Sequence, residues 1–269
     1  MLIDALSARF PTWLCDVWGV VHDGYRPIAP AVAALERHRA EGGKVIFITN
    51  APRPMATIQA QLDEIGVPRA AYDDMVTSGD VTRALMRVHG SQGLYHLGPE
   101  MDLPLFNGLG VKRVALEQAS AVVCTGFFDE AHETAVDYRP RLRDMKRLGL
   151  TMICANPDKV VRKGSLIVPC AGAIAEEYEL MGGEVLMAGK PFAPIYDLAL
   201  LRAGITDKSK VLAVGDGPDT DVKGAMLNGL PVIFISGGIN MGADPGTEVK
   251  LKYPNADILS VMPELYWPA

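Results

Sequence analysis

Four groups of polar residues have the types and positions that a magnesium and phosphate site requires. They are Asp16, Thr49-Asn50, Lys190 and Asp216, and each lies just past a short apolar run or at a sharp connection before a helix. Two carboxylates, a hydroxyl with neighbouring backbone amides, and a cation can together bind Mg2+ and a phosphate group. These residues therefore predict phosphoryl-transfer chemistry if the fold brings them together.

The candidate nucleophile lies in residues 14–24, with the sequence LCDVWGVVHDG. Asp16 ends a predicted buried strand, and Gly19 permits a tight turn directly after it. A carboxylate in this position can attack phosphorus in line and form an aspartyl-phosphate. Taken alone, Asp16 is equally well explained as a strand-terminal aspartate that caps a turn.

The second and third groups supply candidate ligands for phosphate oxygens. In residues 45–52, Thr49 offers a hydroxyl, and the turn that follows offers amide donors. In residues 188–191, Lys190 can neutralise both the nucleophile and the phosphoryl group. Each has an ordinary explanation as well, because Thr-Asn after a strand is a common helix N-cap and most lysines are solvated.

The fourth group is the acidic loop in residues 211–221. Asp216, Asp219 and Asp221 crowd a turn that contains glycine and proline and follows an apolar run. Packed carboxylates repel one another unless a cation offsets their charge. Magnesium favours a few protein carboxylates together with water and phosphate, so the loop indicates a metal site rather than a solvated acidic turn.

The elements that position these groups alternate along the chain. Short apolar runs predict strands in residues 13–17, 45–49, 121–125, 151–155 and 211–214. Residues 30–40 and 191–202 have helical spacing, and Gly204 closes the second helix. This alternation predicts βαβ units and a parallel sheet covered on both faces. Ligands of such sheets bind beyond the carboxyl ends of the strands, where the polar groups lie.

The composition limits the other classes of function. The 269 residues are 49% hydrophobic and 22% charged with a net charge of -6, so we expect a folded protein with no nucleic-acid partner. The four cysteines form no CxxC pair and the five histidines show no HxxxH spacing, which argues against a zinc site. The N-terminal stretch lacks the features of a signal peptide, and no stretch approaches the roughly 18 apolar residues of a membrane span. We therefore expect a cytoplasmic protein with no membrane partner.

The order and combination of the four groups resemble those of the haloacid dehalogenase superfamily. Its class IIA branch, which holds sugar, nucleotide, phosphoglycolate and p-nitrophenyl phosphatases, is the most similar. Three further stretches resemble the cap of that branch, namely residues 121–129, 155–158 and 169–174. The resemblance covers the chain from about Cys15 to about Gly237.

The resemblance implies a role for each residue around the metal and the nucleophile. Asp16 is expected to be the nucleophile and a ligand of Mg2+, with the backbone carbonyl of Trp18 and the side chain of Asp216 as further ligands. Asp221 is expected to contact the metal through a water molecule, as acids around metal sites commonly do. The role of Asp219 is left open.

The resemblance also implies how phosphate and substrate are bound. Thr49, the amide of Asn50 and Lys190 are expected to hold the phosphoryl oxygens, and Lys190 also assists catalysis. Asn156 and Asp158 are expected to face the substrate from the cap. The expected substrate is a small phosphorylated metabolite. A homodimer is left open, since cap-containing members of such families often dimerise.

The fold implied by the resemblance is α/β, with a Rossmann-like parallel-sheet core and an inserted α/β cap of the C2 type. We expect the core in residues 1–80 and 186–269 and the cap in residues 81–185. The inserted segment is too long for a loop and long enough for a small α/β domain. A lid at this place would close over the strand ends and select the leaving group.

Trp18 departs from the family pattern, which has at this position an aspartate that protonates the leaving oxygen and later activates water. An indole nitrogen only donates, and the loss of a general acid/base lowers the rate by about 10²–10⁴. His22 or Asp23 is a candidate substitute. Alternatively, the enzyme acts on esters with good leaving groups, or the protein binds a phosphorylated ligand with little turnover. The first prediction is a Mg2+-dependent phosphatase that hydrolyses a small phosphate monoester through an aspartyl-phosphate.

Three other classes compete with this prediction. A dehalogenase would also use Asp16, but Asp216 and the acidic loop favour a metal. A response-regulator receiver also has acids at strand ends, but the inserted segment and the length of 269 residues disfavour it. A dinucleotide-binding role is poorly supported, because Gly215-Asp216-Gly217 lacks the rest of a GxGxxG fingerprint.

Overall fold

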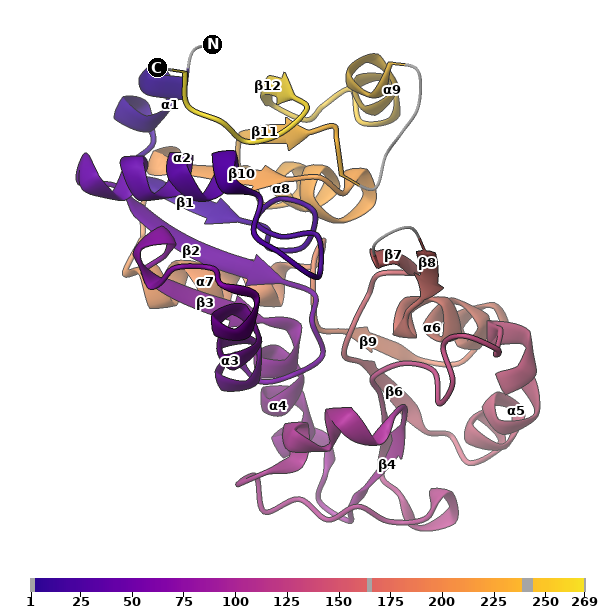
Figure 1. Cartoon of the computed structure of the whole chain (residues 1–269). Coiled ribbons are helices and arrows are strands. Elements are labelled where there is room, and N and C mark those ends of the chain that lie inside the picture. Colours follow the sequence, from indigo (N-terminus) through magenta and orange to yellow (C-terminus); the bar gives the residue numbers. More distant parts are fainter. Residues whose placement is uncertain (1–2, 164–165, 239–243, 269) are drawn as a thin grey trace. The chain divides into compact units, whose positions relative to one another are not determined.

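Short strands alternate with helices along the chain in this computed structural model, which describes residues 3–163, 166–238 and 244–268 (Figure 1). The strands are β1 (Thr12–Cys15), β2 (Lys44–Thr49), β3 (Asp74–Thr77), β4 (Leu94–Leu97), β5 (Ala121–Cys124), β6 (Thr151–Cys154), β7 (Val160–Lys163), β8 (Leu166–Pro169), β9 (Val185–Met187), β10 (Val211–Gly215), β11 (Val232–Ile235) and β12 (Ile258–Met262). The α-helices are α1 (Ile3–Arg9), α2 (Ala29–Ala40), α3 (Met55–Ile65), α4 (Ser78–His89), α5 (Arg139–Arg147), α6 (Ala171–Leu180), α7 (Ala193–Ala203), α8 (Lys223–Leu227) and α9 (Pro245–Lys252). Shorter 3-10 turns are η1 (Arg69–Ala71), η2 (Glu100–Phe106), η3 (Leu116–Gln118), η4 (Ala135–Tyr138) and η5 (Lys208–Lys210), and η6 (Pro218–Val222) is a π-helical turn.

The chain divides into two compact units. Unit 1 consists of Met1–Thr49, Gln59–Val76 and Lys190–Ala269, and unit 2 consists of Asn50–Ile58 and Thr77–Gly189. Unit 2 therefore contains the whole of residues 81–185, and it also includes a short piece, Asn50–Ile58, that follows directly after β2. The predicted cap limits of 81 and 185, and its role as a lid, stay predictions.

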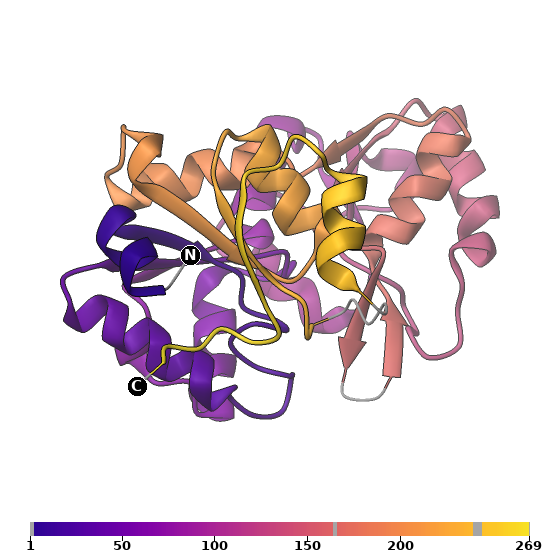
Figure 2. The ribbon, with the colours of Figure 1, turned by 90° about the horizontal axis from the view of Figure 1, so that it is seen from above.

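Unit 1 is built on a six-stranded sheet with the order β12-β11-β10-β1-β2-β3. The central strand β1 pairs in parallel with both β10 and β2. Helix α2 lies on one face of this sheet, and α7 and α8 lie on the other (Figures 1 and 2). The predicted parallel sheet with helices on both faces is confirmed.

The central strands are mostly apolar because both faces of the sheet are covered. Every residue of β1 and of β10 is buried. Trp13 in β1 is completely buried, stacks on His38 at 4.0 Å between ring centroids, and lies 6.4 Å from Trp267. These aromatic residues pack the core near the two chain ends, so they are not a binding platform.

Two helices begin and end where the sequence predicts. Helix α2 spans Ala29–Ala40, against the predicted 30–40, and has proline in its first turn. Helix α7 also has proline in its first turn and ends at Gly204, which has a φ of 70°. A left-handed residue after the last turn favours glycine because a Cβ atom is strained there.

Unit 2 contains a four-stranded parallel sheet with the order β4-β5-β6-β9 and a separate antiparallel hairpin of β7 and β8. Strand β5 shows why this sheet is stable. Val122 and Cys124 join the apolar cluster on one side of the sheet, whereas Ala121 and Val123 join the cluster on the other. Alternate residues of a strand point to opposite faces, so both faces are covered here as well.

All four cysteines are buried and carry free thiols, and buried free cysteines generally behave as small hydrophobic side chains. Among the residues described, every helix falls short of the length and apolar content that crossing a bilayer requires.

Candidate active site

The predicted nucleophile lies where two neighbouring strands end. In the parallel register, Cys15 of β1 faces Val214 of β10, so the residues that follow emerge side by side. The backbone N–H of Asp16 donates to the carbonyl of Val214 at 2.8 Å, and Asp216 follows the last residue of β10. The sheet therefore brings together two acids that are 200 positions apart in the chain.

Three buried carboxylates and one buried ammonium form the centre of the site. Oxygens of Asp16, Asp216 and Asp221 all lie within 4.8 Å of one another. Lys190 Nζ donates to Asp16 Oδ1 at 2.5 Å and to Asp221 Oδ1 at 2.7 Å. The lysine is only 2% exposed. The structure thus gathers the predicted nucleophile, lysine and two predicted metal-site acids, although their chemical roles stay predictions.

The charges in this cluster do not balance. Three ionised carboxylates and one ammonium leave two negative charges in a buried site. Burial, together with repulsion from Asp221 and Asp216, raises the pKa of Asp16 well above its ordinary value, against the opposing effect of Lys190. Burial lowers the pKa of Lys190, but Asp16 and Asp221 outweigh this and raise it. A divalent cation with oxygen ligands would offset the excess, so these residues fit Mg2+.

The backbone around Asp216 leaves no room for larger residues. Gly19 has a φ of +83°, and a Cβ atom there would lie 2.2 Å from Asp216 Oδ2. A Cβ atom at Gly238 would lie 1.8 Å from the same oxygen. The predicted tight turn after Asp16 is present, and it lets the backbone approach the carboxylate closely.

The remaining acids of the fourth group divide between two places. Asp221 Oδ2 accepts the backbone N–H of Gly217 at 3.0 Å, which holds its carboxylate beside Lys190. Asp219 instead accepts a bond from Lys252 Nζ at 2.8 Å and one from the Tyr253 hydroxyl. Asp219 therefore links the acidic loop to α9 and does not belong to the buried cluster.

Trp18 lies where the family pattern has its acid/base aspartate. Its ring meets the His22 ring edge-on at 5.0 Å between centroids. Gly24 has a φ of +100°, and a Cβ atom there would lie 2.9 Å from the indole. The indole thus packs within its own loop. The predicted metal contact of the Trp18 carbonyl stays a prediction.

Both candidate substitutes for an acid/base at position 18 have lowered pKa values. His22 Nδ1 accepts the backbone N–H of Gly24 at 2.9 Å, and burial lowers the pKa of His22 to about 4. Backbone N–H groups of Tyr25 and Arg26 both donate to Asp23 Oδ1, and they lower the pKa of Asp23. A general acid works best with a pKa near the operating pH, so the structure does not favour these two residues in that role.

The predicted phosphate- and substrate-binding residues are placed by the ends of β2 and β6. Thr49 is the last residue of β2 and is 6% exposed. Asn50 follows it, and its Nδ2 donates to Asp158 Oδ1 at 3.0 Å. Asn156 Oδ1 accepts the backbone N–H of Asp158 at 3.1 Å. The structure therefore brings Asn50 and Asp158 into direct contact, an interaction that the sequence analysis does not predict.

A second buried charge pair, between Arg53 and Asp102, was not predicted from the sequence. Arg53 Nε lies 3.7 Å from Asp102 Oδ1, and Asp102 is only 4% exposed. Burial raises the pKa of Asp102 to about 6, against the effect of Arg53. No sequence signal could have found this pair, because Asp102 lies in the short 3-10 turn η2, which carries no recognisable motif.

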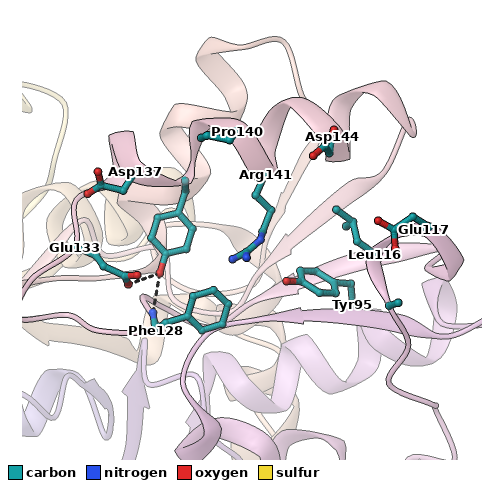
Figure 3. A pocket seen from close by; sticks show the side chains of 11 residues that line it. Tyr95, Leu116, Glu117, Phe128, Glu133, Asp137, Pro140, Arg141 and Asp144 are labelled. Carbon is teal, nitrogen blue, oxygen red and sulfur yellow. Dashed lines mark hydrogen bonds between the residues drawn. The ribbon is translucent and has the colours of Figure 1, made fainter.

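Unit 2 also carries a hollow of about 630 Å³ (Figure 3). Arg141 extends into it, with its guanidinium 5.0 Å from the centre of the Phe128 ring. Four carboxylates border the same hollow, from Glu117, Glu133, Asp137 and Asp144. Four acids against one guanidinium would repel a phosphate ester, so this hollow does not suit the phosphoryl group.

Known proteins and protein families match this chain over most of its length. Residues 13–112 match the profile of the haloacid dehalogenase-like hydrolases, and residues 187–260 match a second profile of HAD-like hydrolases. A crystal structure of a haloacid dehalogenase-like hydrolase from Brucella suis 1330 is 45% identical, covers 98% of both chains and has a TM-score of 0.88. The chain belongs to the haloacid dehalogenase-like hydrolase family.

More distant members of this family carry named activities. D-glycerol 3-phosphate phosphatase of Mycobacterium tuberculosis is 28% identical, over 94% of this chain and 74% of that protein. Acid sugar phosphatase of Staphylococcus aureus is 24% identical, over 86% and 88% of the two chains. The structure of 4-nitrophenylphosphatase from Thermotoga maritima, 22% identical with a TM-score of 0.76 over 97% of this chain and 96% of that one, shows the same fold.

Proposed function

We propose that this hydrolase is a Mg2+-dependent phosphatase that acts on a small phosphate monoester through an aspartyl-phosphate. The observation that carries the proposal is the buried cluster in which Lys190 bridges Asp16 and Asp221 beside Asp216. The named phosphatase activities of its relatives support it. The substrate we propose is a small phosphorylated metabolite.

The residues of the cluster divide the chemistry between them. A carboxylate oxygen of Asp16 attacks phosphorus, the bond to the ester oxygen breaks, and the phosphoryl group remains on Asp16 until water releases it. Lys190 offsets negative charge on Asp16 and on the phosphoryl oxygens, and Asp221 holds the ammonium in place. Thr49 and the amide of Asn50 are the proposed donors to the other phosphoryl oxygens.

The same cluster would hold the metal. Asp16, Asp216 and the carbonyl of Trp18 are the proposed ligands, with Asp221 in contact directly or through water. A bound Mg2+ would neutralise the excess negative charge and draw electron density from the phosphoryl group.

The test is phosphate release with p-nitrophenyl phosphate, glycerol 3-phosphate and a panel of sugar phosphates, with and without Mg2+. We expect Mg2+-dependent release that Asp16→Asn abolishes. Asp219→Asn is the matched control, because Asp219 pairs with Lys252 outside the buried cluster, and it should retain activity. Unchanged turnover in Asp16→Asn would remove the nucleophile assignment.

A second candidate function is turnover restricted to activated esters. It is favoured by Trp18 at the acid/base position and by the low pKa values of His22 and Asp23. Without a general acid, an alkoxide must leave unprotonated, whereas a nitrophenolate needs little protonation. Rapid release from p-nitrophenyl phosphate together with slow release from glycerol 3-phosphate would support this restriction.

A further inference from the structure

The Asn50 side chain is enclosed by two parts of unit 2. Its Nδ2 donates to Asp158 Oδ1 at 3.0 Å, and the residue is 4% exposed. On the other side, a Cβ atom at Gly189 would lie 2.3 Å from Asn50 Oδ1 and 2.8 Å from the Pro157 ring. The residue that follows Thr49 is therefore held between the 156–158 turn and the backbone just before Lys190.

The Asp158 carboxylate is itself on a fixed turn. Its backbone N–H bonds to Asn156 Oδ1 at 3.1 Å, and its carbonyl accepts the N–H of Gly172 in α6 at 3.0 Å. A Cβ atom at Gly172 would lie 2.2 Å from the Pro157 carbonyl oxygen, so α6 packs closely on the turn. The acceptor for Asn50 is thus positioned by a helix and not by a free loop.

We propose that Asp158 is a positioning residue that acts through Asn50 and does not contact the substrate. The inference rests on the proposed function, because it concerns the backbone N–H of Asn50 as a donor to a phosphoryl oxygen. A hydrogen bond from an amide to a carboxylate is stronger than one between neutral groups, so it fixes the Asn50 backbone before the substrate arrives.

Charge supports this assignment over direct substrate contact. A phosphate monoester carries negative charge, and a carboxylate facing it would repel it. The Asp158 carboxylate already accepts a hydrogen bond from the side-chain amide of Asn50, which is a neutral donor. From the sequence, Asp158 is expected to face the substrate. The hydrogen bond to Asn50 instead indicates that Asp158 affects the rate of hydrolysis equally for every substrate.

The experiment compares Asp158→Ala, Asp158→Asn, Asn50→Ala and the double alanine variant on p-nitrophenyl phosphate and glycerol 3-phosphate. Asp144→Ala is the matched control, because Asp144 is an exposed aspartate of the same unit that pairs with Arg147. We expect Asp158→Ala to lower kcat about tenfold on both esters, with little change in KM. Asp158→Asn keeps an acceptor oxygen and should restore most of the rate. The double variant should lose no more than either single variant, since both remove one interaction.

Two kinds of result would overturn the proposal while leaving the phosphatase assignment intact. One is a loss in Asp158→Ala that differs between the two esters or appears mainly in KM, which indicates substrate contact. The other is an additive loss in the double variant, or no loss at all. If the wild-type protein hydrolyses neither these two esters nor any of the sugar phosphates, the proposed function fails. Calorimetric titration with orthophosphate and Mg2+ then decides the positioning role, with about tenfold weaker binding expected in Asp158→Ala but not in Asp158→Asn.

Discussion

Single residues set the chemical limits of this site, and Trp18 sets the most important one. Its ring packs against His22 and Gly24 inside the loop that follows the nucleophile. In the proposed mechanism, position 18 would hold the acid that protonates the leaving group, and an indole cannot do this. We therefore expect proton transfer to the leaving group to be the step that this chain catalyses least well.

Trp18→Asp should therefore increase turnover of glycerol 3-phosphate by about 10²-fold or more, because a general acid contributes a factor of about 10²–10⁴ to the rate. The gain on p-nitrophenyl phosphate should be much smaller, since its leaving group needs little protonation. Trp18→Phe, which keeps a ring but adds no carboxyl group, is the control and should show no gain. Equal gains in both variants would mean that removing the indole, and not adding an acid, causes the effect.

His38 makes stability depend on pH away from the site. It is completely buried against Trp13, its Nδ1 lies 2.7 Å from Ser7 Oγ, and burial lowers its pKa from 6.5 to about 4. Between these pH values the unfolded chain binds a proton that the folded chain does not, so the free energy of unfolding falls as the pH drops from 6.5 towards 4. The loss amounts to about 3 kcal/mol at most.

His38→Asn removes this dependence while keeping a polar atom near Ser7. Urea unfolding at pH 7 and pH 4.5 should show a smaller difference in stability for the variant than for the wild type. Equal differences in the two proteins would assign the acid sensitivity to other groups.

The sequence predicted the residues of the site better than their partners. Asp16 and Asp216 were recognisable because parallel strands bring their carboxyl ends together whatever the intervening chain does. The bond between Asn50 and Asp158 spans 108 positions and depends on how a turn packs against α6. No local pattern encodes that distance, so two residues expected to bind the substrate were not expected to bind each other.

At the scale of elements, Asp80 in the first turn of α4 also accepts a hydrogen bond from the first residue of α3. Thr77 and Asp80 form a capping box, in which Asp80 Oδ2 accepts the N–H of Thr77 at 3.3 Å. The other oxygen of Asp80 accepts the N–H of Met55 at 3.2 Å. One carboxylate thus serves the first turns of two helices that begin 23 residues apart.

Asp80→Ala should lower the free energy of unfolding by about 1–3 kcal/mol, because it removes a cap and a second hydrogen bond. Asp80→Asn retains one acceptor oxygen and should lose about half as much. Urea denaturation of the three proteins measures both values. If the two variants lose the same amount, only one of the two contacts contributes to stability.

Regular elements with strong patterns were predictable, and weakly patterned ones were not. The strands β1, β2, β5, β6 and β10 and the helices α2 and α7 all appear within a few residues of the predicted ranges. The hairpin of β7 and β8 was not predicted, because Leu166 and Ile167 are more than 60% exposed and form no buried run. The pairing of β7 with β8 depends on contacts between these two strands and not on a buried apolar core.

At the scale of the whole molecule, the cluster of acids should make stability depend on Mg2+. A ligand that binds only the folded state stabilises it by about 2.7 kcal/mol at 100 times its Kd. Repulsion among Asp16, Asp216 and Asp221 destabilises the folded state when no cation is bound.

We therefore expect the relative stability of the wild type and Asp216→Asn to depend on whether Mg2+ is present. Without divalent cations, the melting temperature of the variant should equal or exceed that of the wild type, because one repelling charge is gone. Added Mg2+ should raise the melting temperature of the wild type by several degrees and that of the variant by much less. Scanning fluorimetry with EDTA and with Mg2+ measures both. The same Mg2+ shift in both proteins would place the ion elsewhere.

The short piece Asn50–Ile58 has a consequence for protein engineering. The chain passes between the two units four times, at 49/50, 58/59, 76/77 and 189/190, so unit 2 is not one contiguous cassette. Asn50, Arg53 and Met55 all bond to residues within 77–189. A chimera that exchanges only residues 77–189 for the equivalent part of a relative would therefore give these three residues foreign partners. Grafts that carry both pieces should yield folded, active hybrids more often than grafts of the long piece alone.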